Sequence, residues 1–443
     1  MERTPPSRNL HSLMSHRLPA EIFNRLQIVG ALADELGVSA YLVGGLVRNL
    51  LLGRATLDVD IAVEGDGMAF ARRLADRHKA ALKIFERFAT AYVVFPDRMK
   101  FDVANTRAEQ PAHLGAGAEG AWSIPAGDFC PIARDLMRRD FTINTLAIHL
   151  NAGRFGQLLD PAGGLRDLRT RTIRAVYDSS FADDPARVYR AVRFERRFGF
   201  MIERRTLRLL KEATAQGLVH TLPGHRVKNE LMLLLAEPDP ARTIGRLSAL
   251  NLLHPLHPGL RLSPRLKALL AGLANALEWW GRRFPDRPIE RPLIHFTALT
   301  DGLSAPTVHA LMKRLVLPEG QAEKVRTVKH RLEPILRRLG RSRPLTPSQA
   351  YRLLSGLPDE GLVLLVAEAA SASVKRLVSA YLTTYQPTRL AISGKHLASM
   401  GLKSGPVYKA VLDRVLDAKL DGKIATEREE RELAQRLVKK VAV

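Results

Sequence analysis

The feature that most constrains this chain is a run that begins at Gly44-Gly45 and ends at Arg48, followed ten residues later by Asp58 and Asp60. Side chains on a β-strand alternate between its two faces, so two acids at this spacing share a face. Glycines let backbone amides approach a phosphate closely, and the N-terminus of a following helix favours an anion. The arginine could add charge-assisted hydrogen bonds to that phosphate. The pattern therefore indicates carboxylates that hold a divalent metal beside a nucleotide triphosphate.

The two acids predict a particular chemistry. Nucleotidyl transfer uses metal ions that hold the attacking hydroxyl and the leaving pyrophosphate, and carboxylate oxygens suit Mg²⁺. We therefore expect Mg²⁺ on Asp58 and Asp60. A third acid, Asp102, lies on the second strand of a hairpin predicted over residues 91–104. If that strand lies beside the strand of Asp58, Asp102 could join the metal site, or it could equally orient or deprotonate the nucleophile.

A second polar segment, residues 135–144, enters an apolar stretch and carries adjacent arginines, an acid and an amide. Arg139 could neutralise triphosphate charge, and Asp140 could hold ribose or a neighbouring arginine. With Asn144, we expect these side chains to line a nucleotide site. The alternative is a basic turn capped by Asp140.

A third segment begins at Asp184-Pro185, where Pro185 stands at a predicted helix start with Asp184 as its N-cap. Arg187, Arg190 and Arg193 follow on one side of that helix and repel one another unless an anion lies there. An acid and an arginine one turn apart can also recognise a base, because the carboxylate accepts from an exocyclic amine while the guanidinium donates. Cytosine and adenine offer that pattern; uracil and guanine do not. The alternative is helix capping with a solvated basic face.

The composition limits the class of protein. The 443 residues are enough for several domains, and a net charge of +23 indicates a polyanionic partner, most often nucleic acid. Cys130 is the only cysteine, which excludes a disulfide framework and fits a reducing cytoplasm. Residues 1–16 have no apolar signal core, and no apolar run is long enough to span a bilayer. We therefore expect a cytoplasmic protein with no membrane partner.

Hydrophobic periodicity divides the chain into an α/β part and a helical remainder from about residue 183. Residues 109–131 are rich in Gly, Ala and Pro and have no period, which is typical of a functional or disordered loop. Residues 141–150 form a buried apolar element. The other elements predicted in the first part are helices over 19–36, 47–52 and 68–78 and strands over 41–43, 57–63, 91–95 and 100–104.

Taken in order, these motifs resemble the class II tRNA nucleotidyltransferase and bacterial poly(A) polymerase family, within the polymerase-β-like superfamily. The resemblance spans residues 41–230 and includes a further run, Arg226-Val227-Lys228-Asn229-Glu230. It implies an α+β protein, with a polymerase-β-like nucleotidyltransferase head built on a mixed sheet and then an all-α neck, body and tail. The implied boundaries are 1–177, 178–245, 246–345 and 346–443.

The resemblance also assigns roles to residues. It implies that Arg226 and Glu230 support the helix that reads the base, and that Asp184 and Arg187 read it in place of a nucleic-acid template. The implied substrates are the 3′ end of tRNA with ATP and, for full CCA addition, CTP, and the implied tail binds tRNA. The nucleotide-binding set is Gly44, Gly45, Arg48, Arg139, Asp140, Asn144, Asp184, Arg187, Arg190 and Arg193.

Several activities remain open within this resemblance. The segments 135–148, 193–200 and 224–226 look closest to members that add only the terminal A, and full CCA addition is nearly as well supported. Poly(A) synthesis and a non-catalytic role in RNA binding also stay open. Asn49 stands where the family usually has Asp, a departure that touches neither the expected metal ligands nor the base-reading pair.

Overall fold

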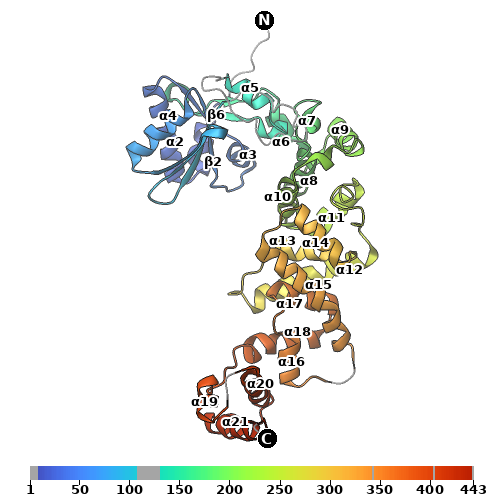
Figure 1. The fold of residues 1–443 in the computed structure, drawn as a ribbon. Helices are drawn as coiled ribbons and strands as arrows, with labels where there is room; N and C mark the ends of the chain where they lie inside the picture. Colours follow the sequence, from blue (N-terminus) through green and yellow to red (C-terminus); the bar gives the residue numbers. More distant parts are fainter. Residues whose placement is uncertain (1–7, 107–129, 342–343, 403–404, 442–443) are drawn as a thin grey trace. The chain divides into compact units, whose positions relative to one another are not determined.

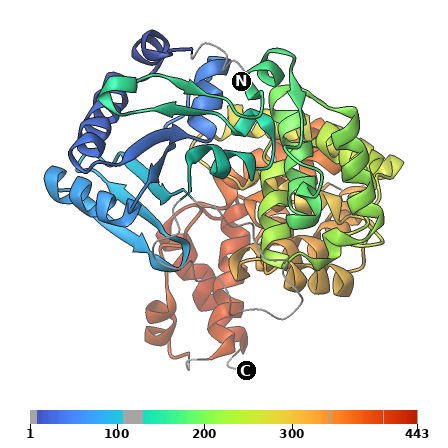
Figure 2. The same cartoon turned by 90° about the horizontal axis from the view of Figure 1, so that it is seen from above.

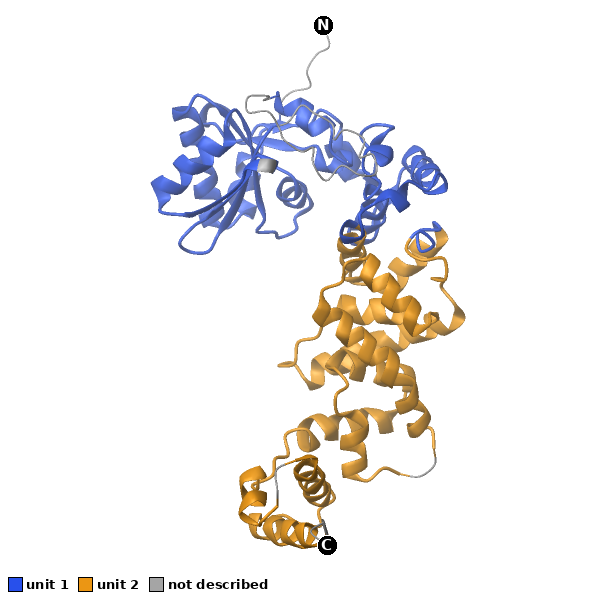
Figure 3. Ribbon diagram, viewed as in Figure 1, with its two compact units in different colours: residues 1–226, 250–255 blue, residues 227–249, 256–443 orange. Residues whose placement is uncertain are grey.

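The computed structural model describes residues 8–106, 130–341, 344–402 and 405–441, and the loop predicted over 109–131 lies almost wholly outside them. The chain forms two compact units (Figure 3). The first comprises residues 1–226 with 250–255, and the second comprises 227–249 with 256–443. Each unit is described by itself below.

The first unit is built on a seven-stranded mixed sheet with the order β3-β4-β5-β2-β1-β6-β7. β2 and β5 are parallel, whereas the other neighbouring pairs are antiparallel. The strands can be followed from blue to green in Figure 2. Their bounds are β1 Ser39–Val43, β2 Val59–Glu64, β3 Ala81–Phe85, β4 Thr90–Val94, β5 Lys100–Asn105, β6 Ala147–His149 and β7 Leu158–Leu159.

Helices α2 (Ala20–Glu35) and α4 (Gly67–His78) pack against this sheet and against each other (Figure 1). Both are amphipathic, and the buried stripe of α2 includes Ile22, Leu26 and Val29. α2 approaches the end of β6 so closely that a Cβ on Gly30 would lie 1.9 Å from the carbonyl oxygen of Leu150. The glycine is therefore required for this packing.

Most of the predicted elements of the first unit are present. The helices at 19–36 and 68–78 and the 91–104 hairpin appear as α2, α4 and the β4–β5 pair. The strand predicted from residue 57 is wrong at its start, because β2 begins at Val59 and leaves Asp58 just outside it. The pairing with β1 ends at Asp60, and the β5 pairing reaches only to Val59. Asp58 therefore has no strand partner to extend the ladder.

Downstream of the hairpin, the buried element at 141–150 is a 3₁₀ turn, η2 (Thr142–Asn144), followed by β6. The predicted N-cap at Asp184 is also corrected, because α8 (Arg187–Phe198) begins after an N-cap at Ala186. The backbone at Asp184 is extended, and its carboxylate accepts a hydrogen bond from the backbone amide of Ala186 at 3.1 Å. The remaining elements are α1 His11–Arg17, α3 Gly45–Leu52, η1 Glu86–Phe88, α5 Ile132–Met137, η3 Ala152–Arg154, α6 Gly164–Arg169, β8 Thr172–Ile173, α7 Ser180–Asp183, β9 Met201–Ile202, α9 Arg204–Ala215 and η4 Leu218–Thr221.

The second unit is helical throughout its described residues, as predicted, and α10 (Gly224–Leu235) crosses into it from the first unit. α12 packs on α17, and α13 and α15 complete the same layer. The last helices enclose a separate small core that includes Leu397, Val411 and Val415. The helices are α11 Pro240–Ala249, α12 Pro264–Arg283, α13 Arg291–Leu299, α14 Ala305–Arg314, α15 Glu319–Leu339, α16 Pro347–Leu354, α17 Asp359–Ala369, α18 Ala372–Ala380, the π-helical turn η5 Tyr381–Tyr385, α19 Gly394–Ser399, α20 Pro406–Leu420 and α21 Glu427–Val441. Within the described part of the chain, no helix has the length and apolar character needed to cross a membrane.

Candidate active site

A glycine turn joins β1 to α3 and touches the central acid of the sheet. Gly44 has φ +73° and ψ −140°, a conformation that disfavours side chains. A Cβ on Gly44 would lie 2.7 Å from Oδ2 of Asp60. Only glycine fits here, so the turn and the carboxylate form one continuous surface at the start of α3.

Asp60 and Asp102 face each other across the parallel β2–β5 pair, where they are register partners. The strand of Asp102 therefore lies beside the strand that carries Asp60, which was the condition for Asp102 to join the site. Burial raises the pKa of Asp60, and the charges of Asp102 and Asp58 raise it further, against the opposing charges of Arg139 and Lys100. A bound cation would relieve the repulsion among these carboxylates.

The surroundings of the three acids differ. Asp58 is exposed, whereas Asp60 is half-buried. Asp102 is ion-paired with Lys100, whose Nζ lies 2.9 Å from Oδ1. This contact raises the pKa of Lys100.

The acidic side chains suit a divalent metal whose remaining ligands would come from the substrate and water. Among the described residues, no group of three or more His, Cys, Asp or Glu side chains is arranged to hold an ion alone. Mg²⁺ in nucleotide sites is bound by one or two carboxylates together with substrate phosphates and water. Asp58 and Asp60 supply oxygen donors of that kind beside the Gly44 turn.

The glycine turn opens into a cleft of about 480 Å³ in which arginine is the most frequent lining residue. It contains every residue of the expected nucleotide-binding set, brought together from β2, α3, η2, α8 and the segments between them. Three aspartates face six arginines there, which leaves an excess of positive charge for an anion. The lining residues are Gly44, Gly45, Arg48, Asp60, Arg139, Asp140, Asn144, Asp184, Arg187, Arg190, Arg193, Phe194 and Arg197.

Arg48 is one of the two most buried cations of the cleft, and 6% of its surface is exposed, as for Arg193. Burial lowers the pKa of Arg48 to about 10, and the charges of Arg197, Arg193 and Arg190 act in the same direction against Asp140. A guanidinium held among others gains stability when a polyanion such as a triphosphate binds.

Asp140 and Asn144 connect α8 to α3. Nε and Nη2 of Arg190 donate to Oδ2 of Asp140, at 2.9 and 2.6 Å. Oδ1 of Asp140 accepts from the Asn144 amide at 2.8 Å, and the Asn144 oxygen accepts from Arg48 at 2.6 Å. Burial alone would raise the pKa of Asp140, but Arg190 and the hydrogen bonds lower it to about 2. Of the two roles left open for Asp140, the structure shows contact with an arginine.

Arg139 and Arg187 are each held by neighbouring groups. Arg139 pairs with Asp135 at 3.0 Å. Arg187 donates to the hydroxyls of Tyr177 at 2.8 Å and Ser180 at 2.7 Å, and to the Arg138 carbonyl at 3.0 Å. Both guanidiniums are therefore oriented before any ligand binds.

Asp184 lies beside Arg187, with 4.0 Å between its Oδ2 and the arginine Nε. The same oxygen accepts from Arg226 at 2.9 Å. Arg226 therefore contacts Asp184, the acid of the expected base-reading pair. Glu230, the other residue expected to support the base-reading helix, is buried on α10 within the second unit.

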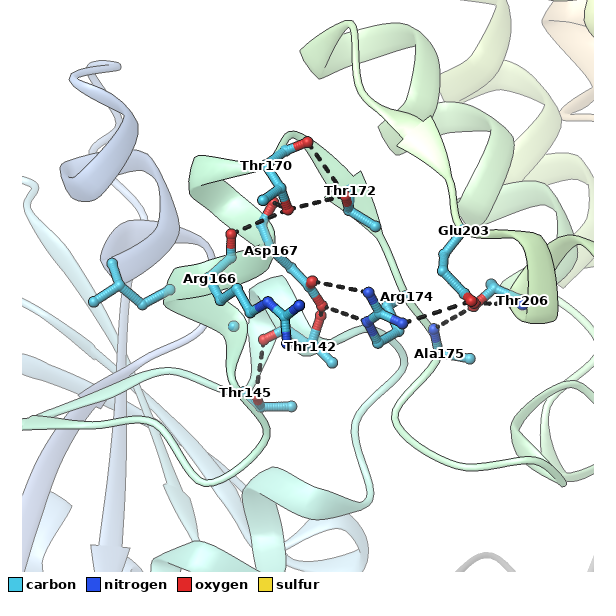
Figure 4. A network of polar contacts seen from close by, with 12 residues as sticks. Thr142, Thr145, Arg166, Asp167, Thr170, Thr172, Arg174, Ala175, Glu203 and Thr206 are labelled. Atoms are coloured by element: carbon cyan, nitrogen blue, oxygen red, sulfur yellow. Dashed lines mark hydrogen bonds and ion pairs between the residues drawn. The ribbon is translucent and has the colours of Figure 1, made fainter. Parts of the chain in front are cut away.

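A further polar network, which involves α6 and Arg174, holds η2 in place (Figure 4). Thr142 donates to the buried Asp167 at 2.6 Å, and Asp167 also pairs with Arg174 at 2.9 Å. Arg174 extends to Glu203, whose carboxylate caps α9. The network anchors the segment that carries Asn144.

Several residues at the site were not predicted from the sequence. Arg197 lies one turn after Arg193, so the arginine spacing could have included it. Asp135 stands four residues before Arg139, so the i,i+4 spacing could have indicated that pair. Tyr177 and Ser180 orient Arg187 through contacts that depend on the fold, and no sequence pattern marks them.

Fold and site together define a nucleotidyltransferase with a poly(A) polymerase-type head. The family described as "Poly A polymerase head domain" matches residues 40–174, and "Probable RNA and SrmB- binding site of polymerase A" matches 199–262. The chain is 31% identical to an A-adding tRNA nucleotidyltransferase of Halalkalibacterium halodurans, over 92% of this chain and 90% of the relative. It therefore belongs to the tRNA nucleotidyltransferase family, whose members generally need a divalent metal.

Other similar proteins agree, and one of them is about twice as long as this chain. The chain is 39% identical to an A-adding tRNA nucleotidyltransferase of Geobacter sulfurreducens over 97% of its own length, and it spans about half (48%) of that relative. The Thermotoga maritima CCA-adding enzyme complexed with tRNA has a TM-score of 0.77 at 30% identity, covering 98% of this chain and 99% of that one. A CCA-adding enzyme in complex with ATP gives 0.80 at 30% identity, with the same two coverages.

Proposed function

We propose that this protein adds the terminal adenosine of the CCA end to tRNA, using ATP and no nucleic-acid template. The observation that carries the proposal is the union of three features: the arginine cluster and the Asp184–Arg187 pair in one cleft, and the Asp60–Asp102 pair, of which Asp60 lines that cleft. The A-adding relatives support the A-adding activity over full CCA addition, which the similarity to CCA-adding structures keeps as the second candidate.

The proposed reaction follows from the residues present. The 3′-hydroxyl oxygen of tRNA bonds to the α-phosphorus of ATP, the bond from that phosphorus to the bridging oxygen breaks, and pyrophosphate leaves. Asp102 orients the hydroxyl and accepts its proton, while Arg48, Arg139 and Arg190 hold the triphosphate. When bound, Mg²⁺ on Asp58 and Asp60 would neutralise charge on the reacting phosphates.

Base selection is assigned to Asp184 and Arg187. The carboxylate accepts from the exocyclic amine of adenine, and the guanidinium donates to the adjacent ring nitrogen. Cytosine presents the same order of groups, so this pair excludes guanine and uracil and leaves the choice between A and C to the surroundings. Arg226 fixes the carboxylate.

We further propose the four-part division at 177/178, 245/246 and 345/346, with tRNA held by the helical parts, and a cytoplasmic location, where tRNA is processed. The net charge of +23 supports a polyanionic partner. In this division the nucleotide cleft draws on the head and the start of the neck.

The experiment that tests the function supplies four tRNA substrates, complete or lacking one, two or three terminal residues, with Mg²⁺ and labelled ATP or CTP in separate reactions. We expect ATP incorporation only on tRNA ending in CC. Incorporation of CTP on shorter ends would replace the proposal by full CCA addition, and long ATP tails on unrelated RNA would replace it by poly(A) synthesis. Incorporation on none of them would leave a non-catalytic role in RNA binding.

A further inference from the structure

Residues 53–57, which lead from α3 to Asp58, lie along a cavity instead of a packed surface. The cavity has a volume of about 480 Å³, and its other walls are the junction of α1 with α2 and one side of α3. Leu57 is 69% exposed, so the side chain next to Asp58 contributes little packing. Within the described part of the chain, residues 55–57 also make no hydrogen bond. On this side of β2, the position of Asp58 therefore depends on a contact made earlier in the segment.

Arg54 makes such a contact, with the end of α8. Its Nη1 donates to the carbonyl oxygen of Arg197 at 3.0 Å, and its guanidinium carbon lies 5.0 Å from the ring centroid of Phe198. The last four carbonyls of a helix have no partner inside that helix, and the C-terminus favours a cation. A charge-assisted hydrogen bond and a cation–π contact therefore join the segment before Asp58 to the last turn of α8.

The end of α8 is itself fixed against the arginine cleft. Phe198 is 8% exposed, and the guanidinium carbon of Arg48 lies 4.7 Å from the centroid of its ring. Arg48 lines the cleft and donates to Asn144, so it cannot move freely. The ring of Phe198 thus contacts two arginines, one from α3 and one from the segment that follows α3. Through this ring, Arg54 fixes the segment relative to the nucleotide cleft.

We propose that Arg54 is a positioning residue, which ties the segment before Asp58 to the end of α8 and thereby holds Asp58 beside Asp60 for metal binding. The inference rests on the proposed function, because it takes Asp58 as a ligand of the metal in that reaction. Arg54 lies outside the lining of the arginine cleft, so the nucleotide itself does not need it. Loss of the Arg54 side chain is therefore expected to weaken metal binding more than nucleotide binding.

Arg17 offers a matched control for substitutions of Arg54. It lines the same cavity, and its Nη1 donates to the carbonyl oxygen of Leu50 in the last turn of α3, at 3.0 Å. Arg17→Met and Arg54→Met each remove one positive charge and one hydrogen bond to a carbonyl near the end of a helix. Only Arg54→Met removes the link to α8.

The first test measures the anchoring of the segment in the protein without metal or nucleotide. Chymotrypsin cleaves after leucine where a segment leaves the fold, so cleavage after the exposed Leu57 reports local opening. We expect Arg54→Met to speed this cleavage at least about threefold, the scale of one lost exposed cation–π contact. Arg17→Met should stay near the native rate. No acceleration in Arg54→Met, or an equal acceleration in both variants, would overturn the proposal.

The second test measures metal binding without any chemistry. Mn²⁺ alone is titrated into the protein, free Mn²⁺ is quantified by electron paramagnetic resonance, and Asp58→Ala identifies the binding that belongs to this site. We expect Arg54→Met to weaken that binding about fivefold, while the Kd of ATP without metal changes no more than in Arg17→Met. Arg54→Lys keeps the charge and a donor and should recover part of the loss.

Unchanged Mn²⁺ affinity in the folded Arg54→Met protein, or an equal loss in Arg17→Met, would show that Arg54 does not place the metal ligand. Because neither measurement uses tRNA or nucleotide transfer, the two results decide this inference separately from the incorporation assay that tests the proposed function.

Discussion

At the scale of single residues, the charge of Asp60 serves the proposed function but lowers the stability of the fold. Its pKa is raised by burial and by two neighbouring acids, so the folded state disfavours its charge. We expect Asp60→Asn to reduce nucleotide incorporation on the order of 10³-fold, because a preorganised electrostatic contact is lost, while the melting temperature stays level or rises. Incorporation assays and thermal unfolding of the same preparation measure both. A fully active Asp60→Asn protein would refute its role at the metal.

Arg226 acts through another residue, since it touches the carboxylate of Asp184. We expect Arg226→Leu to lower kcat/KM for ATP about tenfold and to weaken discrimination against GTP, because Asp184 loses its orientation. Competition between labelled ATP and GTP measures the discrimination, which a general loss of stability would not change. Arg205→Leu, which removes the exposed pair with Asp178, is the control. Discrimination at the wild-type level would show that Arg226 has only a structural role.

His149 makes the stability of the first unit depend on pH. It is 2% exposed, and burial lowers its pKa to about 4, with Arg154 acting in the same direction and Asp34 opposing. In the unfolded chain, His149 therefore takes up a proton near pH 6.5, whereas in the folded chain it stays neutral until about pH 4. The stability of the fold falls as the pH drops between these two values. We expect protonation of His149 to lower the free energy of unfolding by about 2 kcal/mol at pH 5.

The measurement is denaturant unfolding at pH 7 and at pH 5. His149→Phe keeps a ring against Tyr41, whose centroid lies 4.7 Å away. It loses no hydrogen bond, since neither ring nitrogen has a partner among the residues that the structure describes. The variant should lose less stability between the two pH values than the wild type. Equal losses would assign the acid sensitivity to other groups.

At the scale of elements, the close approach of α2 to the sheet gives another prediction. Gly30→Ala forces a Cβ to 1.9 Å from the Leu150 carbonyl, and we expect a loss of about 2–3 kcal/mol in the free energy of unfolding. Gly281→Ala, on α12 with open space around its Cβ, should instead be neutral or gain up to about 1 kcal/mol. Denaturant titration compares them. A stable Gly30→Ala protein would mean that α2 can move away from β6.

The elements also show why sequence patterns predict some structure and miss the rest. β4 alternates buried and half-buried positions, so its period is visible, whereas β3, an edge strand, has no buried position. The segment before β6 is buried on all sides, and no period separates a 3₁₀ turn from a strand there. Likewise the residues that line the arginine cleft carry unusual polar spacing, but the groups that orient them, such as Tyr177 and Asp167, become neighbours only through the fold.

At the scale of the whole molecule, the net charge of +23 is far larger than a nucleotide site requires. Three aspartates offset half of the six arginines in the cleft, so the excess resides elsewhere in the chain. If that excess binds tRNA phosphates, each contact releases counterions, and affinity falls steeply as salt rises.

We therefore expect the Kd of tRNA to rise at least about tenfold between 50 and 200 mM salt, approaching the dependence of proteins with several phosphate contacts. Fluorescence anisotropy of labelled tRNA at constant Mg²⁺ measures the slope. The control is the Kd of ATP over the same range, which should change less because five of the six arginines of its cleft are buried or half-buried and therefore less screened. A flat response for tRNA would mean that the positive charge serves another purpose, and the acceptor would then be recognised mainly at its 3′ end.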